Sequence, residues 1–237
     1  MFDIDNLINS QVDLDPWRHQ IVDKFFSKDH FDKIEKAAKD LLMAYNGQYI
    51  TANNCLTIAQ VYDTIGQEVF DILLEINSII LDNIDRIVLN YPNHRKFIRY
   101  ASIPTFHILP KNFGPQKIHD ESYDKTCSIV VYLYPNMSIG TAFFKGSTQD
   151  TFVKELEWKQ NRGMIFCGEK HVTWHDFYSR DNPRVTLNFF IRELKHINIE
   201  ERNESKCITG IDGPQVTIPN SLPDNVIERL FSGVLFK

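Results

Sequence analysis

The chain has 237 residues, of which 43% are hydrophobic and 24% are charged, and its formal net charge is −5. This composition supplies enough apolar side chains for a packed core and excludes a disordered chain. A mildly acidic chain has no general electrostatic attraction to nucleic acid or to an anionic membrane, so we expect neither as a partner.

The four cysteines are widely spaced, at Cys55, Cys127, Cys167 and Cys207. No two form a CxxC pair, which argues against a zinc finger, thioredoxin-type chemistry and a disulfide framework. Scattered thiols are typical of a reducing compartment. The opening MFDIDNLINS lacks the basic and apolar regions of a secretory signal, and no apolar run is long enough to span a bilayer. We therefore expect a cytoplasmic protein.

The first part of the chain has a mainly helical pattern. Residues 1–15 are polar and acidic and predict a loose lead-in, and the short apolar run 20–26 favours a strand. Apolar residues recur at helical spacing over 27–45 and again over 57–89, where Gly66 indicates a break. These helices are expected to support a sheet.

The pattern changes near Phe97 to short runs typical of β-strands, separated by turn residues. The expected strands cover 97–109, 116–121, 126–134, 140–145, 152–158, 163–167, 171–175 and 184–191. Eight short strands after a helical lead-in predict a mainly β fold with supporting helices, of the jelly-roll or a similar double-sheet type. We expect one domain over 1–237, with helical support at 27–92, a β core at 97–192 and a polar tail at 193–237. The tail includes a short helical stretch at 224–231.

A candidate metal site begins with His119-Asp120-Glu121. Side chains alternate faces along a strand, so His119 and Glu121 can point to one side as a pair of ligands. Alone, this triplet is a weak signal, and an exposed polar turn is the competing interpretation.

A third ligand would come from a distant segment, and His171 and His175 are both candidates because they share a face of an extended chain. The shorter spacing to Arg184, with a turn at Asn182-Pro183 between, favours His175. Two imidazoles and one carboxylate on one face of an iron ion leave the opposite face open for a cosubstrate and oxygen.

The segment 184–191 alternates between a polar and an apolar face. Val185, Leu187, Phe189 and Ile191 form the apolar face and should pack in the core. Arg184, Thr186 and Asn188 form a polar row on the other face. A guanidinium binds a carboxylate through two parallel hydrogen bonds, and a hydroxyl two residues on can add a third, so this row can hold a small dianion.

Residues 126–134 repeat this alternation, with Cys127, Ile129, Val131 and Leu133 on one face and Ser128, Val130, Tyr132 and Tyr134 on the other. A tyrosine hydroxyl in an apolar interior usually has a partner. Tyr132 can therefore help to hold the cosubstrate carboxylate, or it can be a core tyrosine bonded to the backbone.

Four segments resemble the 2-oxoglutarate/iron(II) oxygenase superfamily, within its prolyl-hydroxylase-like group that includes phage and bacterial members. They are PWRHQIVDKFF, IHDESYDKTCSIVVYLYP, GTAFF, and NRGMIFCGEKHVTWH followed by PRVTLNFFIR. The detailed resemblance covers about 97–192. The separate motifs are weak, whereas their order and spacing together are fairly specific.

The resemblance implies a double-stranded β-helix, a cupin-like jelly roll. It implies Fe(II) held by His119, Glu121 and His175, with His171 and Asp120 in reserve, and 2-oxoglutarate held by Arg184 with Thr186 assisting. From their strand faces, Tyr132 and Asn188 are further candidates for binding the cosubstrate. No catalytic residue beyond the metal ligands is expected. The implied reaction is hydroxylation with O2, releasing succinate and CO2.

The primary substrate stays open, as a protein residue such as proline or a small molecule, and so does the oligomeric state. Two alternatives also stay open: a binding or sensing module without turnover, and another cupin-type metal enzyme, on the same β scaffold.

Overall fold

In the computed structural model the chain forms two facing β-sheets with helices on one side. The structure describes residues 2–45, 55–93, 99–114, 117–121, 125–193, 198–202, 205–209, 216–219 and 221–234. Across these ranges, no helix combines the length and the apolar composition needed to cross a membrane.

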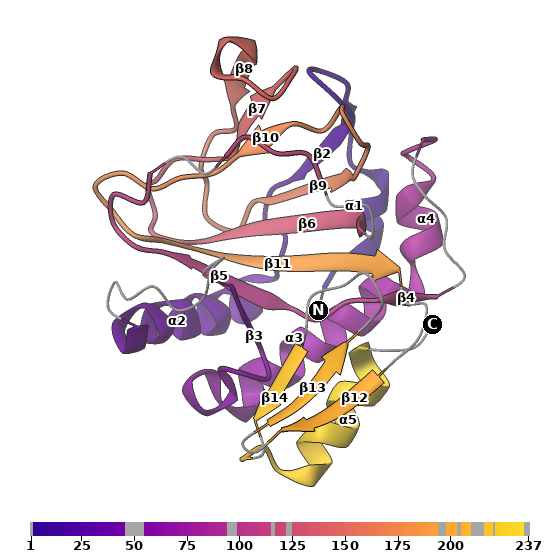
Figure 1. Ribbon diagram of the computed structural model, residues 1–237, viewed down its shortest axis with the longest axis vertical. Coiled ribbons are helices and arrows are strands. Elements are labelled where there is room, and N and C mark those ends of the chain that lie inside the picture. Colours follow the sequence, from indigo (N-terminus) through magenta and orange to yellow (C-terminus); the bar gives the residue numbers. More distant parts are fainter. Residues whose placement is uncertain are drawn as a thin grey trace.

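The large sheet consists of antiparallel strands in the order β1-β2-β9-β6-β11-β5-β3, with β4 also paired to β11. Their bounds are β1 Val12–Asp13, β2 His19–Val22, β3 Cys55–Thr57, β4 Tyr100–Ala101, β5 Thr105–Leu109, β6 Lys125–Tyr134, β9 Gly163–Cys167 and β11 Arg184–Glu193. The long strands β6 and β11 lie side by side in the middle of this sheet (Figure 1).

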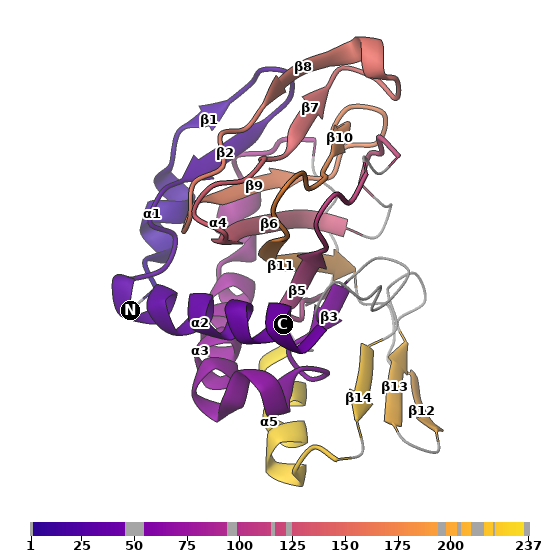
Figure 2. The same ribbon diagram turned by 90° about the vertical axis from the view of Figure 1, so that its left-hand side faces the viewer.

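A smaller sheet, in the order β10-β7-β8, faces the large one (Figure 1, Figure 2). Its strands are β7 Ala142–Phe144, β8 Phe152–Glu155 and β10 His175–Asp176, and a short 3-10 helix, η1 Gln149–Thr151, precedes β8. Trp17, Phe143, Met164 and Phe166 pack against one another between the two sheets. Two antiparallel sheets that face each other in this way form the double-stranded β-helix, and the predicted fold class is confirmed.

The alternation predicted for the two central strands is observed. Val185, Leu187, Phe189 and Ile191 of β11 are 0% exposed and belong to the main core. The hydroxyl of Thr186 donates to the side-chain oxygen of Asn188 at 3.2 Å, so these two buried residues share the opposite face. Tyr134 departs from the prediction: a register shift near the end of β6 turns its side chain toward the main core, away from the face of Tyr132. An extra residue in one strand moves the later side chains of that strand to the opposite face.

Helices α2 Lys28–Tyr45 and α3 Tyr62–Asp82 lie on the outer side of the large sheet (Figure 2). Their apolar stripes supply fully buried residues to the main core, among them Leu41 and Phe70. The predicted break at Gly66 is present as a non-helical residue with φ of +75°, a conformation that glycine adopts without steric cost. The helix predicted to begin at residue 57 begins later, because Cys55–Thr57 pairs with β5 as a strand.

The N-terminus is more ordered than the predicted loose lead-in. It contains helix α1 Ile4–Asn9, in which Leu7 is buried. The carboxylate of Asp3 accepts a hydrogen bond from the amide of Asn6 at 3.0 Å and so caps the helix. A short helix, α4 Ile84–Val88, follows α3.

The C-terminal tail also has more structure than its polar sequence predicts. It forms a third sheet, β12 Asn198–Arg202, β13 Ser205–Thr209 and β14 Val216–Pro219, and then helix α5 Asp224–Val234. The predicted helical stretch is confirmed by α5, whose Val226 and Leu230 are buried in the main core.

Two of the predicted strands, those that contain His119 and His175, are shorter in the structure than predicted. In 116–121, residue 116 lies outside the described residues and only His119 makes an isolated β-bridge. Of 171–175, only His175 is extended, because Val172 and Thr173 donate their amides to the carbonyl of Glu169 and close a turn. In the predicted strand 97–109, residues 97 and 98 lie outside the described ranges, and the rest divides into β4 and β5.

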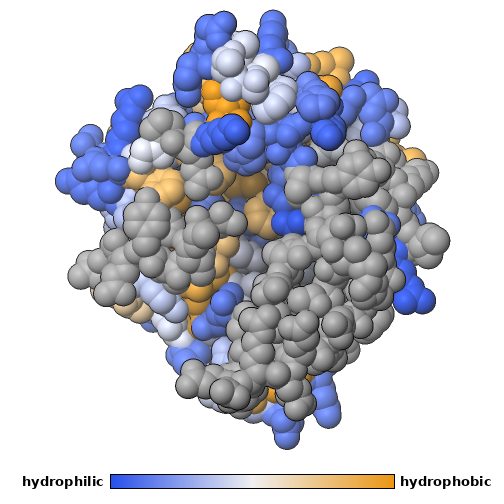
Figure 3. Space-filling model, in the orientation of Figure 1, coloured by the Kyte–Doolittle hydropathy of each residue, from blue (hydrophilic) through white to orange (hydrophobic). Residues whose placement is uncertain are grey.

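The face seen in Figure 3 shows hydrophobic residues in small separate areas among hydrophilic ones.

Candidate active site

His119 and His175 are distant in sequence but adjacent in the fold. The amide of His119 donates to the carbonyl of His175 at 3.1 Å, and the amide of His175 donates to the carbonyl of His119 at 2.9 Å. Residues paired in an antiparallel bridge project to the same side. Their ring centroids are accordingly 4.4 Å apart.

Each imidazole is oriented by a backbone carbonyl two residues earlier. Nδ1 of His119 lies 2.9 Å from the carbonyl oxygen of Lys117, and Nδ1 of His175 lies 2.8 Å from that of Thr173. A carbonyl can only accept, so Nδ1 carries a proton, and in the neutral form of each ring Nε2 keeps its lone pair. Burial and the neighbouring His119 lower the pKa of His175 to about 4, so this ring is neutral at pH 7.

Glu121 supplies a buried carboxylate beside this pair, with its side chain 2% exposed. The ammonium of Lys125 lies 2.5 Å from its Oε2, and the hydroxyl of Ser128 donates to its Oε1 at 2.7 Å. Burial opposes ionisation, but the charge of Lys125, the charge that His175 acquires at low pH, and the two hydrogen bonds outweigh it and lower the pKa of Glu121 to about 2. Gly168 packs directly against this side chain: a Cβ at Gly168 would lie 2.8 Å from Cβ of Glu121.

The side chains of His119, His175 and Glu121 are of the chemical types that bind iron, but they do not converge on one point. In the part of the chain that the structure describes, no three His, Cys, Asp or Glu side chains lie close enough to hold a metal ion. Two neutral imidazoles and one carboxylate are the donors of the facial iron site. If Glu121 is the third ligand, as predicted, its carboxylate would have to leave Lys125 to complete the set.

The reserve ligands lie together, apart from the histidine pair. His171 is exposed, with φ of +64°, and its amide donates to the carboxylate of Asp120 at 2.6 Å. Nδ1 of His171 is also 3.7 Å from the same carboxylate oxygen. Asp120 thus stabilises the turn that precedes β10, because its carboxylate accepts a hydrogen bond from a backbone amide of that turn.

Arg184 begins β11 and is 3% exposed. Its Nη1 lies within hydrogen-bonding distance of the carbonyls of Ile139, Gly140 and Tyr178, at 2.9, 3.4 and 3.2 Å. Its Nε has no hydrogen-bond partner among the described residues. Burial lowers the pKa of Arg184 to about 10, so it stays charged at pH 7. A buried cation with an unpaired donor is a suitable site for a ligand carboxylate.

The aromatic side of this arginine is formed by Trp158 and Tyr132, whose rings stack 4.4 Å apart. The guanidinium carbon of Arg184 lies 4.9 Å from the ring centroid of Trp158 and 5.8 Å from that of Tyr132. The Tyr132 hydroxyl donates to the hydroxyl of Thr141 at 3.0 Å and accepts from the amide of Thr141 at 2.9 Å. This bonding matches the interpretation of Tyr132 as a core tyrosine, and its contact with a cosubstrate stays a prediction.

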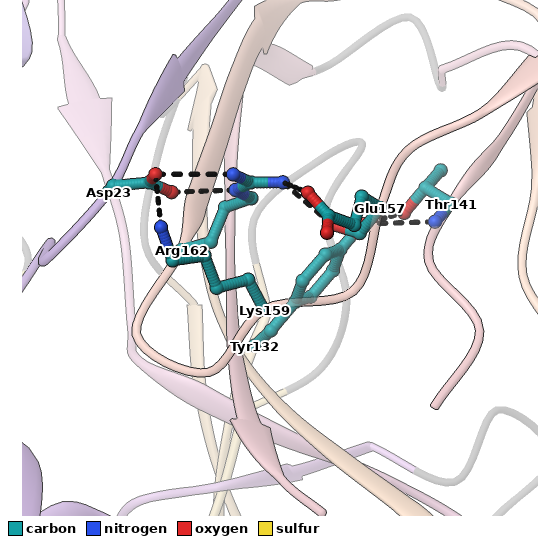
Figure 4. Close-up of polar contacts among 6 residues, drawn as sticks. All are labelled: Asp23, Tyr132, Thr141, Glu157, Lys159 and Arg162. Carbon is teal, nitrogen blue, oxygen red and sulfur yellow. Dashed lines mark hydrogen bonds and ion pairs between the residues drawn. The ribbon is translucent and has the colours of Figure 1, made fainter. Parts of the chain in front are cut away.

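An ion-pair network supports the strand that carries Tyr132 (Figure 4). Arg162 pairs with Asp23 through Nε at 2.6 Å and with Glu157 at 3.2 Å, and Lys159 also contacts Asp23, at 2.7 Å. The hydrogen bond from Arg162 lowers the pKa of Asp23 to about 2. The carbonyl of Arg162 accepts the amide of Tyr132 at 2.9 Å, so the network holds the turn before β9 against β6.

Sequence reasoning did not single out His107. It pairs in register with Thr186 across β5 and β11, so the two side chains share a face. Its ring lies 4.6 Å from that of Phe177, which in turn lies 5.9 Å from the ring of His119. The alternation with the core residues Phe106 and Ile108 was the signal that could have found it.

No protein-family model and no curated protein matches the chain. Among solved structures, a prolyl hydroxylase from Trichoplax adhaerens, in complex with a hypoxia inducible factor oxygen degradation domain peptide fragment, is similar. It has 13% sequence identity and a TM-score of 0.54, over 80% of this chain and 88% of that chain.

Two further solved structures have lower TM-scores. A viral collagen prolyl hydroxylase from Paramecium Bursaria Chlorella virus-1, in a 2OG complex, has 14% identity and a TM-score of 0.47, over 74% of this chain and 96% of that chain. A prolyl-4-hydroxylase from Pseudomonas putida has 13% identity and a TM-score of 0.48, over 80% and 92%. The likeness to the Trichoplax structure shows that this chain has the double-stranded β-helix fold of prolyl hydroxylases.

Proposed function

We propose that this protein is an Fe(II)- and 2-oxoglutarate-dependent dioxygenase that hydroxylates a residue in a protein, such as proline, or a small molecule. The observation that carries the proposal is the His119–His175 pair. Each ring is fixed through Nδ1 by a backbone carbonyl and offers Nε2 to a metal, on the inner side of a double-stranded β-helix. Glu121, buried and ionised beside this pair, is the proposed third ligand.

The metal and its cosubstrate, when bound, supply the oxidising chemistry that turns O2 and a C–H bond into a hydroxyl group, with succinate and CO2 as products. The residues of the chain bind and orient. Arg184 holds the far carboxylate of 2-oxoglutarate, and Thr186, on the same face of β11, adds a hydroxyl that turns from Asn188 to donate to this carboxylate. Without the cosubstrate, the side-chain oxygen of Asn188 accepts the hydrogen bond of the Thr186 hydroxyl at 3.2 Å.

The buried charge of Arg184 gives independent support. A guanidinium buried to this degree and without a carboxylate partner among the described residues has an electrostatic cost that a ligand dianion would remove. The stacked rings of Trp158 and Tyr132 exclude water from one side of it, which strengthens such an ion pair.

A binding or sensing module without turnover is the second candidate, and one observation favours it. The Glu121 carboxylate is already neutralised by Lys125, and no three-ligand group is assembled in the described residues. If Glu121 does not leave Lys125, the two histidines alone would hold a metal only weakly.

Anaerobic titration of the purified protein with Fe(II) and then 2-oxoglutarate tests the proposal. We expect a visible metal-to-ligand charge-transfer band in the wild type. His175→Ala should abolish it, whereas His171→Ala, which removes an exposed imidazole outside the pair, should keep it. A folded wild type without the band, or a band that survives His175→Ala, would contradict the proposed site.

A further inference from the structure

Lys125 holds a position inside the site that the proposed chemistry does not use. Its side chain is 14% exposed, and its ammonium lies 2.5 Å from Oε2 of Glu121. The same ammonium lies 4.0 Å from the centroid of the Phe190 ring. The positive charge is therefore held between a buried carboxylate and an aromatic face, both of which attract it.

The proposed metal would need the same carboxylate. Both imidazoles are expected to bind in their neutral form, so Glu121 is the one negative charge in the proposed ligand set. Two cations close together in a low-dielectric interior repel each other, so the ammonium of Lys125 and a metal ion at the histidines disfavour each other's presence. Lys125 and a divalent metal ion are therefore in competition for one carboxylate.

The second carboxylate oxygen of Glu121 has a partner of its own, which can hold the side chain while Lys125 is replaced by a metal ion. Ser128 is 0% exposed and donates to Oε1 at 2.7 Å, independently of Lys125. The Ser128 bond can persist while the side chain rotates, since a carboxylate accepts more than two hydrogen bonds or metal contacts. Glutamate is one methylene longer than aspartate, so its carboxylate can take more positions from the same backbone site.

We propose that Lys125 is an internal counter-ion that occupies Glu121 in the metal-free protein and gives it up when a divalent metal binds. This inference rests on the proposed function, because it assumes a metal at His119 and His175. Lys125 is thus a positioning residue that acts through Glu121. It stabilises the metal-free fold and weakens metal binding.

Cobalt(II) is the probe, because its visible absorption reports ligation without turnover, and calorimetric titration at pH 7.5 gives its affinity. Lys125→Gln keeps a hydrogen-bond donor for Glu121 and removes the charge, and Lys125→Met removes both. Lys125→Arg keeps the charge. Lys154→Met is the matched control, because Lys154 also pairs with a carboxylate, Asp13 at 2.9 Å, and lies 5.9 Å from the centroid of the Phe143 ring.

We expect Lys125→Gln to bind Co(II) about tenfold or more tightly than the wild type, since the repulsion between two cations is removed. Lys125→Arg and Lys154→Met should bind as the wild type does. Metal-free Lys125→Met should melt at a lower temperature, and Co(II) should raise its melting temperature more than that of the wild type. If Lys125→Met does not fold, the Co(II) affinity of Lys125→Gln still tests the counter-ion role.

One combination of results would overturn the counter-ion role alone: the wild type binds Co(II), His175→Ala does not, and Lys125→Gln binds it no more tightly than the wild type. Two other results would overturn the proposed metal site as well. In the first, neither the wild type nor Lys125→Gln binds Co(II); in the second, His175→Ala binds it as the wild type does. The two failures are therefore distinguishable.

Discussion

Replacing Arg184 by methionine should remove recognition of the far carboxylate of 2-oxoglutarate and leave the metal ligands unchanged. Methionine retains apolar contact with the Trp158 ring, which lies 4.9 Å from the guanidinium carbon. The contact that would be lost is the proposed charged fork of two hydrogen bonds, each worth about 1.5–3 kcal/mol. Their sum of about 3–6 kcal/mol corresponds to a loss of about two to four orders of magnitude in affinity.

The fold itself should tolerate the change. Three carbonyl oxygens, of Ile139, Gly140 and Tyr178, lose their shared donor Nη1. Removing a buried guanidinium also removes its desolvation cost, which offsets part of that loss. The free energy of unfolding, measured by urea denaturation, should therefore change by less than about 3 kcal/mol.

The assay is calorimetric titration of Mn(II)-loaded protein with 2-oxoglutarate and with 2-oxopentanoate, which lacks the far carboxylate. The wild type should bind 2-oxoglutarate far more tightly, whereas Arg184→Met should bind both ligands with the same weak affinity. Arg162→Met is the control, because the Arg162 side chain pairs with Asp23 and Glu157 (Figure 4), whereas its contact with Tyr132 is made by the backbone carbonyl and is kept. A 2-oxoglutarate affinity in Arg184→Met within about threefold of the wild type would refute the assignment of Arg184.

Three further changes test the fold. Asp23→Asn should lower the free energy of unfolding at pH 7 by about 1 kcal/mol, since solvent screens the pair of the 39% exposed Asp23 with Arg162. Because the folded pKa of about 2 lies below the ordinary 3.8, the difference from the wild type should be complete above about pH 5 and be lost as the pH falls through 2 in urea titrations. A pH-independent difference would exclude the ion pair as its cause. Gly140→Ala should cost about 3 kcal/mol or more, because the new Cβ would lie 1.6 Å from the carbonyl oxygen of Leu156, and an unchanged melting temperature would contradict this contact. Leu187→Ala should cost about 2–5 kcal/mol in urea denaturation because Leu187 is 0% exposed; a loss below about 1 kcal/mol would mean that its side chain is not in the core.

Local patterns in the sequence were sufficient for the fold class and for the faces of the central strands. The helix over Lys28–Tyr45 follows from apolar residues at helical spacing, and the break at Gly66 from its special backbone freedom. On β11 the alternation correctly separates the apolar core face from the face of Thr186 and Asn188. These features depend on neighbours in sequence, and periodicity records them directly.

Other features depend on partners that periodicity does not reveal. The C-terminal three-stranded sheet and helix α1 come from segments too short or too polar to give a clear pattern. The turn of Tyr134 toward the main core depends on a register shift between β6 and β11. A shift of this kind belongs to a pair of strands and not to either strand alone.

In the candidate site the sequence alone determined the residue types: two histidines, a carboxylate and a buried arginine on a polar strand face. Only the tertiary structure decided which groups meet. It pairs His119 with His175, leaves His171 with Asp120, and ties the Glu121 carboxylate to Lys125. The physical reason is that a buried charge needs a partner of opposite charge or a hydrogen bond nearby. Which groups lie nearby depends on the packing of segments far apart in the chain.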